Sequence, residues 1–329
     1  MTEIDKNHIE TITNFLNEEN IEYHLNDNIE GTFILKNSEL EIRYVNTFEH
    51  KMDYTKRFNI KGVPHNFFIN ISKSNYENNI RTIWIKDWEM EENETIYNQD
   101  GSVELNYHRK WNVLKSYIKT ASGKVNNRFY ARNCEIKIVN NSELRPFLTK
   151  NCFYGYRAAT VNLGLYLKKD IGDVKAGTLL MVYTFGHPFY AKGKYDVEVI
   201  RVATKLNSQV IGGASKLLKH FLTNYPTISV NKKDVIVNTI CFYVDADHND
   251  GRSLQTLGFE YVSWQGAGFM NVEAATRTVF HRKPLLHKLI MERMAKGEVY
   301  SVSNAGTIVY KIEREKYLNQ LNNTNESSE

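Results

Sequence analysis

The chain has 329 residues, 42% of them hydrophobic and 24% charged, a composition typical of a soluble globular protein with two ordinary domains. No apolar run approaches the roughly 20 residues of a membrane span and no signal-type start is visible, so we expect a cytoplasmic protein without a membrane partner. The formal net charge of +4 is small for this length. It excludes a general polycation, so any nucleic-acid site must be local.

The cysteines predict neither disulfides nor a metal centre. Cys134, Cys152 and Cys241 are odd in number and lack the spacing of metal ligands. We therefore expect free thiols in the core.

The first 130 residues predict a small α/β domain. Apolar spacing and β-rich runs give, in chain order, a helix around 9–16, a hairpin of Thr32–Leu35 and Leu40–Val45, a strand over 80–87 and an amphipathic helix around 111–119. The acidic, Asn-rich segment 89–103 predicts a loop or insertion.

This arrangement precedes the joint Arg128-Phe-Tyr-Ala-Arg-Asn-Cys134, and together they resemble the nuclease-like module of bacteriophage homing endonucleases. The resemblance implies carboxylates that hold Mg²⁺. Glu30, Glu39 and Glu41 are the weak metal candidates, but no acidic-x-Lys pair follows them on an adjacent strand. The alternatives are a solvated strand edge, or a degenerate module kept for packing or DNA docking.

The segment 131–317 predicts a second domain. Its expected strands are 134–139, 162–167, 178–185, 195–204, 235–245 and 306–313, with a helix that begins at the plausible N-cap Ser142. The tail 318–329 is rich in Asn, Ser and Glu and predicts disorder.

The stretch from Leu206 to Ser215 predicts an anion-binding turn. Gly212 and Gly213 permit close approach to the backbone, and the following helix points its N-terminal N–H groups at whatever lies over them. A plain strand-to-helix connection is the alternative.

Gln209-x-x-Gly212-x-Ala214 resembles the signature with which GNAT acyltransferases hold acyl-coenzyme A, and Leu257-Gly258-Phe259 is similar to a later GNAT turn. The resemblance covers roughly 134–314. It implies an α/β (α+β) fold with a mixed, mainly antiparallel twisted sheet flanked by helices. It also implies acetyl-CoA or another acyl-CoA as cofactor, bound by Gln209, Gly212, Gly213 and Ala214.

Three strand ends carry candidate catalytic groups. His187, in Phe-Gly-His-Pro, can act as a base or pack as a turn histidine. Glu198 and Arg201 lie on opposite faces of a regular strand, so only one can face a cleft. By the GNAT resemblance Glu198 is a general-base candidate, whereas Arg201 can bind a phosphate.

The segment 243–250 is rich in Asp and His. Tyr243, Asp245 and Asp247 alternate along a strand and share a face at its end, where the GNAT resemblance places the substrate opening. An ordinary β-to-α turn also favours Asp and Asn.

The segment 276–297 is basic and has an apolar stripe. A helix from about Pro284 would leave Arg277, Arg282, Lys283 and Lys288 free to contact nucleic-acid phosphates. A solvated basic helix is the alternative.

Together these motifs resemble the Mom-like branch of the GNAT superfamily, bacteriophage proteins that modify adenine in DNA. Matched to this sequence, the resemblance implies functional roles for His187, Arg201, Ser215, Tyr243 and Asp245. The first hypothesis is therefore a Mom-like group transferase acting on DNA bases. The alternatives are a homing-type endonuclease with a GNAT-like DNA-recognition domain, and a non-catalytic DNA- or protein-binding factor.

Overall fold

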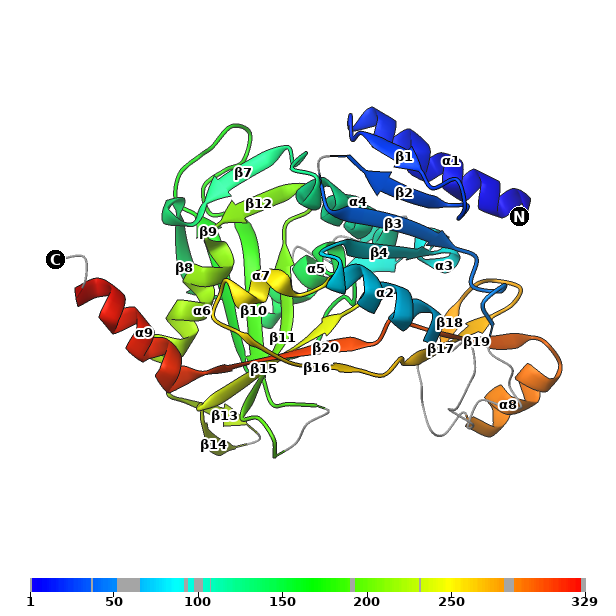
Figure 1. The fold of residues 1–329 in the computed structure, drawn as a ribbon. Coiled ribbons are helices and arrows are strands. Elements are labelled where there is room, and N and C mark those ends of the chain that lie inside the picture. Colours follow the sequence, from blue (N-terminus) through cyan, green and yellow to red (C-terminus); the bar gives the residue numbers. More distant parts are fainter. Residues whose placement is uncertain are drawn as a thin grey trace.

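The computed structural model describes residues 2–36, 38–51, 66–91, 94–97, 103–106, 108–189, 193–230, 232–280 and 287–326. Within these ranges the chain is a mixed α/β protein built on a four-stranded and a seven-stranded sheet (Figure 1). None of the helices in this part of the chain has the length and apolar character needed to cross a bilayer.

The N-terminal sheet has the order β1-β2-β3-β4, antiparallel except for the parallel pair β3 and β4. Its strands are β1 (Tyr23–Leu25), β2 (Thr32–Leu35), β3 (Leu40–Val45) and β4 (Arg81–Lys86). The accompanying elements are α1 (Glu3–Glu18), α2 (Phe67–Glu77), α3 (Asp87–Glu91), β5 (Glu94–Tyr97), β6 (Val103–Asn106) and α4 (Arg109–Ala121).

Capping and apolar spacing explain α1. The Thr2 hydroxyl accepts a hydrogen bond from the Asp5 N–H at 3.2 Å, and the Asp5 carboxylate accepts one from the Thr2 N–H at 2.8 Å, a capping box. Ile12 and Leu16 are fully buried against one face of the sheet. The helix, hairpin, strand and second helix predicted here are confirmed. The predicted loop 89–103 instead contains the end of α3 and a β5–β6 hairpin.

The larger sheet has the order β16-β20-β15-β11-β10-β9-β8, and all neighbours are antiparallel except β11 and β15. Its strands are β8 (Cys134–Ile138), β9 (Val161–Leu167), β10 (Leu179–Gly186), β11 (Val197–Thr204), β15 (Thr239–Asp245), β16 (Glu260–Gln265) and β20 (Thr307–Glu313).

Two helices cover opposite faces of this sheet. Leu144 and Leu148 of α5 (Asn141–Asn151) pack on Val182 and Ala203. On the other face α6 (Gly213–Asn224) contacts β9 and β10, and Phe221 stacks on Phe185 with ring centroids 3.7 Å apart. We call these the α5 face and the α6 face.

Smaller elements complete the described chain. They are β7 (Asn127–Tyr130), a 3₁₀ turn (Ala131–Asn133), β12 (Ser208–Ile211), β13 (Thr227–Val230), β14 (Lys233–Ile236), α7 (Arg252–Gln255), β17 (Phe269–Glu273), β18 (Val279–Phe280), α8 (His287–Ala295), β19 (Val299–Ser303) and α9 (Arg314–Glu326). β7 pairs in parallel with β12, and β18, β17 and β19 form a separate sheet.

Two details differ from the sequence predictions. Asn140, not Ser142, caps α5, because the Asn140 side-chain oxygen accepts from the Glu143 N–H at 2.9 Å. Helix α9 runs through 318–326, where a disordered tail is predicted. Its first residue is anchored by hydrogen bonds from Arg314 to the carbonyls of Asn238 (2.8 Å) and Leu222 (2.7 Å).

The three cysteines are free and buried, as predicted.

Candidate functional site

A bulge in β11 brings two predicted site residues to the same face. Opposite β11, Thr184 pairs with Arg201 and Gly186 pairs with Glu198, while Ile200 is the extra residue between them. Thr184 and Gly186 are two residues apart and share a face, so Arg201 and Glu198 share it too. The expectation that these side chains point to opposite faces is therefore wrong, because strand parity does not hold across a bulge.

The neighbouring strand adds further predicted residues to this face. Cys241 of β15 lies opposite Glu198, so Cys241, Tyr243 and Asp245 face the same side. Pairing between β11 and β15 ends at Val199 and Phe242. Arg201 and Asp245 therefore lie on two strands beyond the point where their hydrogen bonding stops, on the α5 face.

Residues of the loop after α5 form hydrogen bonds with side chains of both strands. Arg201 donates from Nε to the Gly155 carbonyl at 3.1 Å and from Nη1 to the Ile200 carbonyl at 2.8 Å. Tyr154 donates its hydroxyl to Asp245 Oδ2 at 2.7 Å. The Tyr154 ring is 54% exposed although its hydroxyl is turned inward, so this residue forms part of the surface of the site.

Glu198 is a buried carboxylate with cations around it. It is 6% exposed and accepts a hydrogen bond from the Phe189 N–H at 2.8 Å. Burial raises the pKa of Glu198, and the nearby charges of Arg157, Arg201 and His187 act in the opposite direction. A carboxyl group with a raised pKa is a better proton acceptor than an ordinary carboxylate.

Asp245 is the outer member of a buried ionic cluster that both sheets supply. Its Oδ2 accepts from His248 Nδ1 at 2.7 Å, and His248 Nε2 lies 3.6 Å from Glu89 of α3. Lys86 of β4 pairs with Asp247. We call Lys86, Glu89, Asp245, Asp247 and His248 the buried cluster.

Two members of this cluster, His248 and Asp245, owe their ionisation to each other and to their neighbours. Burial opposes ionisation of His248, but Asp245 and Glu89 raise its pKa to about 10, so it is an imidazolium at neutral pH. Burial alone would raise the pKa of Asp245, but His248 lowers it below its ordinary value. Both groups are therefore charged at neutral pH.

The other predicted catalytic residues have different positions. Tyr243 is half-buried on the α5 face, and burial raises its pKa. His187 is exposed one residue beyond β10, close enough for its charge to act on Glu198. Ser215 is exposed in the first turn of α6, on the opposite face, and is not brought together with the others.

The turn before α6 does not form the open cradle that the sequence predicts. Gly212 has φ +73° and is exposed, but a Cβ on Gly213 would lie 2.8 Å from Met181 Sδ and 3.0 Å from Val210 Cγ1. Protein side chains, rather than a ligand, therefore approach Gly213. Gln209 belongs to β12, in register with Arg128 of β7.

The nearest lysine at this turn is also engaged. Lys216 donates to the carbonyls of Ala131 at 2.8 Å and Cys134 at 2.6 Å. Gln209, Gly212, Gly213 and Ala214 thus do not fit acyl-coenzyme A as a pyrophosphate cradle.

The weak metal candidates are dispersed. Glu41 is buried, pairs with Arg43 and accepts from Asn75 at 3.0 Å, whereas Glu39 binds the Asn79 amide and Glu30 is exposed elsewhere. Among the described residues no group of three His, Cys, Asp or Glu could hold a metal ion.

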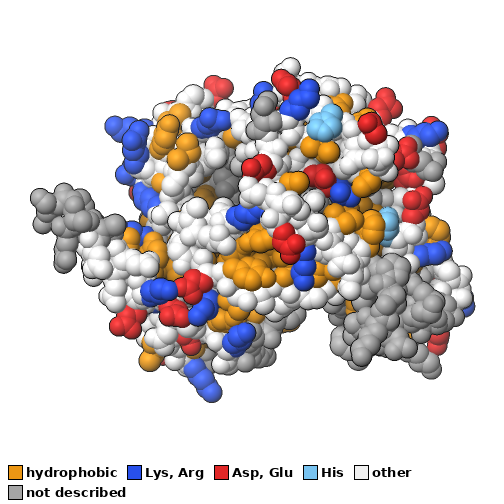
Figure 2. Space-filling model, viewed as in Figure 1, with side chains coloured by type: hydrophobic (Ala, Val, Ile, Leu, Met, Phe, Trp, Pro, Cys, Tyr) orange, Lys and Arg blue, Asp and Glu red, His pale blue; other side chains and the backbone are white. Residues whose placement is uncertain are grey.

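The predicted phosphate-binding residues are only partly described. Arg277 donates to the Tyr300 hydroxyl at 2.8 Å and lies 3.5 Å from Asp87, so it is a structural residue and not a free cation. Arg282 and Lys283 lie outside the described residues, and the side chain of Lys288 does too. On the face in Figure 2, basic side chains are interspersed with acidic ones.

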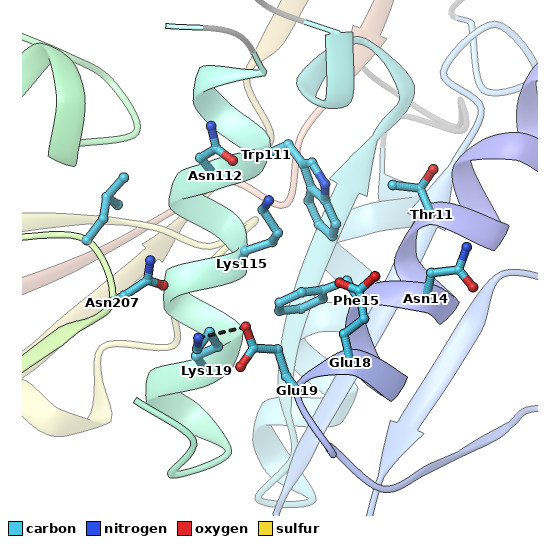
Figure 3. A pocket seen from close by; sticks show the side chains of 11 residues that line it. Thr11, Asn14, Phe15, Glu18, Glu19, Trp111, Asn112, Lys115, Lys119 and Asn207 are labelled. Carbon is cyan, nitrogen blue, oxygen red and sulfur yellow. Dashed lines mark hydrogen bonds and ion pairs between the residues drawn. The ribbon is translucent and has the colours of Figure 1, made fainter. Parts of the chain in front are cut away.

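A cavity in the N-terminal half shares no residue with this site. It measures about 370 Å³ and lies between α1, α4 and the turn at Asn207 (Figure 3). Phe15 and Trp111 line it, as do Lys119 and Glu19, which form an ion pair of 2.7 Å. The cavity and the reactive side chains are therefore in different places, and the reactive side chains lie on the α5 face.

Sequence reasoning missed Tyr154, Arg157, Lys86 and Glu89. The aromatic run Phe153-Tyr-Gly-Tyr-Arg157 is a signal for a functional loop, but no spacing rule connects it to β15. Neither a protein-family model nor a curated protein sequence matches this chain.

Proposed function

We propose that this chain is a GNAT-fold group transferase of the Mom-like kind, which acts on the amine of a DNA base. The observation that carries the proposal is the β11 bulge, because it places Glu198 and Arg201 together where β11 and β15 part. The GNAT resemblance implies a substrate opening at this point. The strand order of the large sheet, with one parallel pair at its centre, is further support.

The residues suggest a division of labour. Glu198 accepts the proton that the acceptor amine loses when its nitrogen bonds to the electrophilic carbon of an activated donor; the bond from that carbon to its leaving group breaks, and the leaving group departs with the bonding electrons. A carboxylate whose pKa is raised by burial suits this role. Arg201 is held by the Gly155 and Ile200 carbonyls, and no acceptor for its Nη2 group is found within the described part of the chain. That group binds the anionic part of a substrate.

A DNA base must leave the duplex to reach this face. The exposed aromatic side chains of Tyr154 and Phe189, 54% and 53% exposed, border the site and suit stacking with an extruded base. Arg157 lies over the Phe189 ring at 4.5 Å and adds a positive charge. These features support a nucleic-acid acceptor.

Mass spectrometry of nucleosides from the DNA of cells that express the protein tests the proposal. Wild type should produce a modified nucleoside, and Glu198→Gln should abolish it because the amide cannot accept the proton. Glu135→Gln, which removes an exposed carboxylate of β8 paired with Lys137, is the matched control and should retain the modification.

Two results would overturn the proposal. One is unmodified DNA in cells with abundant, folded wild-type protein, which would favour a non-catalytic binding factor. The other is full modification by Glu198→Gln, which would remove Glu198 from the chemistry.

A further inference from the structure

A continuous chain of polar contacts leads from inside the protein to the surface of the candidate site. It runs from Glu89 to His248 (3.6 Å), from His248 to Asp245 (2.7 Å) and from Asp245 to the Tyr154 hydroxyl (2.7 Å). Glu89 belongs to α3 of the N-terminal segment, while the other three belong to the segment that carries the site. Only Tyr154 is exposed.

Asp245 accepts three hydrogen bonds. Its Oδ2 receives hydrogen bonds from Tyr154 and His248, and its Oδ1 receives one from the Asp247 N–H at 3.1 Å. A carboxylate with three donors is poorly placed to take a proton from a substrate. Its geometry instead suits the orientation of the Tyr154 phenol.

His248 is equally constrained. Its ring is 3% exposed and packs on Phe153 with centroids 4.2 Å apart. The Arg81 guanidinium also donates to the His248 backbone carbonyl at 2.9 Å. The imidazole therefore lies between two carboxylates, one from each segment: Nδ1 is hydrogen-bonded to Asp245, and Nε2 forms a longer ion pair with Glu89 without a hydrogen bond.

We propose that Glu89 and His248 are positioning residues of the transferase site, through which the N-terminal segment orients Asp245 and the exposed Tyr154. The role of Tyr154 in the transferase site rests on the proposed function, whereas the contacts from Glu89 to Tyr154 do not. The N-terminal segment is then a structural half of the active site, whether or not it has chemistry of its own.

The remaining charges around His248 are accounted for. Lys86 of β4 neutralises Asp247, and both are closed to solvent. The imidazole interacts directly with Glu89, Asp245 and Asp247, and the Arg81 guanidinium lies against the backbone carbonyl of the same residue. Removing the Glu89 charge therefore leaves Asp245 as the main partner of the imidazolium.

NMR titration of ¹³C-labelled histidines tests the inner part of the chain, with His248 assigned by His248→Gln. Glu89→Gln should lower the pKa of His248 by about 1 to 3 units, the usual effect of losing a nearby opposite charge. Glu91→Gln is the matched control. Glu91 is in the same helix, its side chain is 57% exposed, and it contacts His8 instead.

The outer part is tested at the site. In Glu89→Gln the transfer rate should begin to fall at a lower pH, by the same amount as the pKa of His248 falls, and KM for DNA should not change. Glu89→Asp should partly restore the wild-type pH profile. Tyr154→Phe keeps the ring but removes the hydroxyl that donates to Asp245. It should therefore change the His248 resonance through Asp245, at the other end of the chain of contacts. This second variant carries the test if Glu89→Gln does not fold.

The outcomes separate this inference from the proposed function. An unchanged His248 titration in Glu89→Gln, or a changed titration with an unchanged rate profile, would overturn the positioning role. If wild type shows no transfer at all, the proposed function fails, and the NMR chemical shifts of the ¹³C-labelled Tyr154 ring decide instead. Tyr154 shifts that are the same in Glu89→Gln and wild type would overturn the inference.

Discussion

Lys86 and Asp247 are 161 residues apart in the chain and form an ion pair that is closed to solvent on both sides. One partner is on the last residue of β4 and the other follows β15, so the pair joins the two sheets. Asp247 also accepts from the Ala305 N–H at 2.8 Å. The two segments are therefore joined by groups that neither can bury alone.

Removing one partner of this pair should be severely destabilising. Lys86→Met leaves the Asp247 carboxylate buried without its cation, and a cost of about 3 to 5 kcal/mol in the free energy of unfolding is expected. Lys86→Met combined with Asp247→Asn should recover part of this loss, because the net charge of the buried cluster is then the same as in wild type. Urea unfolding measures both, and Lys175→Met, at an exposed pair with Asp170, should have little effect. Equal losses in Lys86→Met and the double variant would contradict this account.

The stability should fall at alkaline pH because of His248. Its pKa is raised from the ordinary 6.5 to about 10, so its contribution is complete below about pH 6.5 and is lost as the pH rises through about 10. Between these values the slope is up to about 1.4 kcal/mol per pH unit for one proton. Urea unfolding at pH 6.5, 8 and 9.5 should show this slope in wild type. His248→Gln should be nearly independent of pH in this window, and a parallel decline in that variant would contradict the prediction.

Gly213 should be required for packing. In Gly213→Ala the new Cβ meets Met181 and Val210, and overpacking of this kind costs about 1 to 3 kcal/mol. Gly266→Ala is the matched control, since nothing lies within 4 Å of its added Cβ. Thermal unfolding compares the two. If both were equally stable, the glycine would be free for ligand approach, as the sequence first indicates.

The basic segment should affect DNA binding separately from Arg277. If Arg282, Lys283 and Lys288 contact phosphates, changing all three to Ala should flatten the slope of log affinity against log salt by about two to three units. Arg277→Gln should instead lower stability, because it removes the contacts to Tyr300 and Asp87. Fluorescence anisotropy at several salt concentrations gives the slopes. An unchanged slope in the triple variant would assign the segment to another role.

The purified protein with Mg²⁺ or Mn²⁺ should leave duplex DNA intact. The Glu41 carboxylate is engaged by Arg43 and Asn75, and Glu30 and Glu39 are not gathered around it. Gel electrophoresis of plasmid DNA checks this. Cleavage that disappears in Glu41→Ala would favour the endonuclease alternative.

The sequence predicts element positions well because periodicity is local. The strands at Leu40–Val45, Val161–Leu167 and Thr307–Glu313 lie close to where alternation and β-branched residues place them. The shared face of Tyr243 and Asp245 also follows from regular strand geometry. Both predictions depend only on residues near each other in the chain.

The predictions are wrong where the structure depends on contacts between residues that are far apart in the sequence. The parity of Glu198 and Arg201 depends on a bulge in β11, and the environment of Gly213 depends on Met181 of β10. Tyr154 reaches Asp245 across 91 residues. No local pattern encodes these contacts, so the site could be predicted in part and its connection to the N-terminal segment could not.

The order of the small sheet leaves β4 as an edge strand, and the chain around Asp247 covers it. The Trp84 N–H donates to the Asp247 carbonyl at 2.8 Å, so part of this edge is already satisfied by backbone from the other sheet. An uncovered edge is a template for pairing with other chains. Loosening the contact between the two segments would therefore do more than disturb the site, because it would expose a strand prone to intermolecular aggregation.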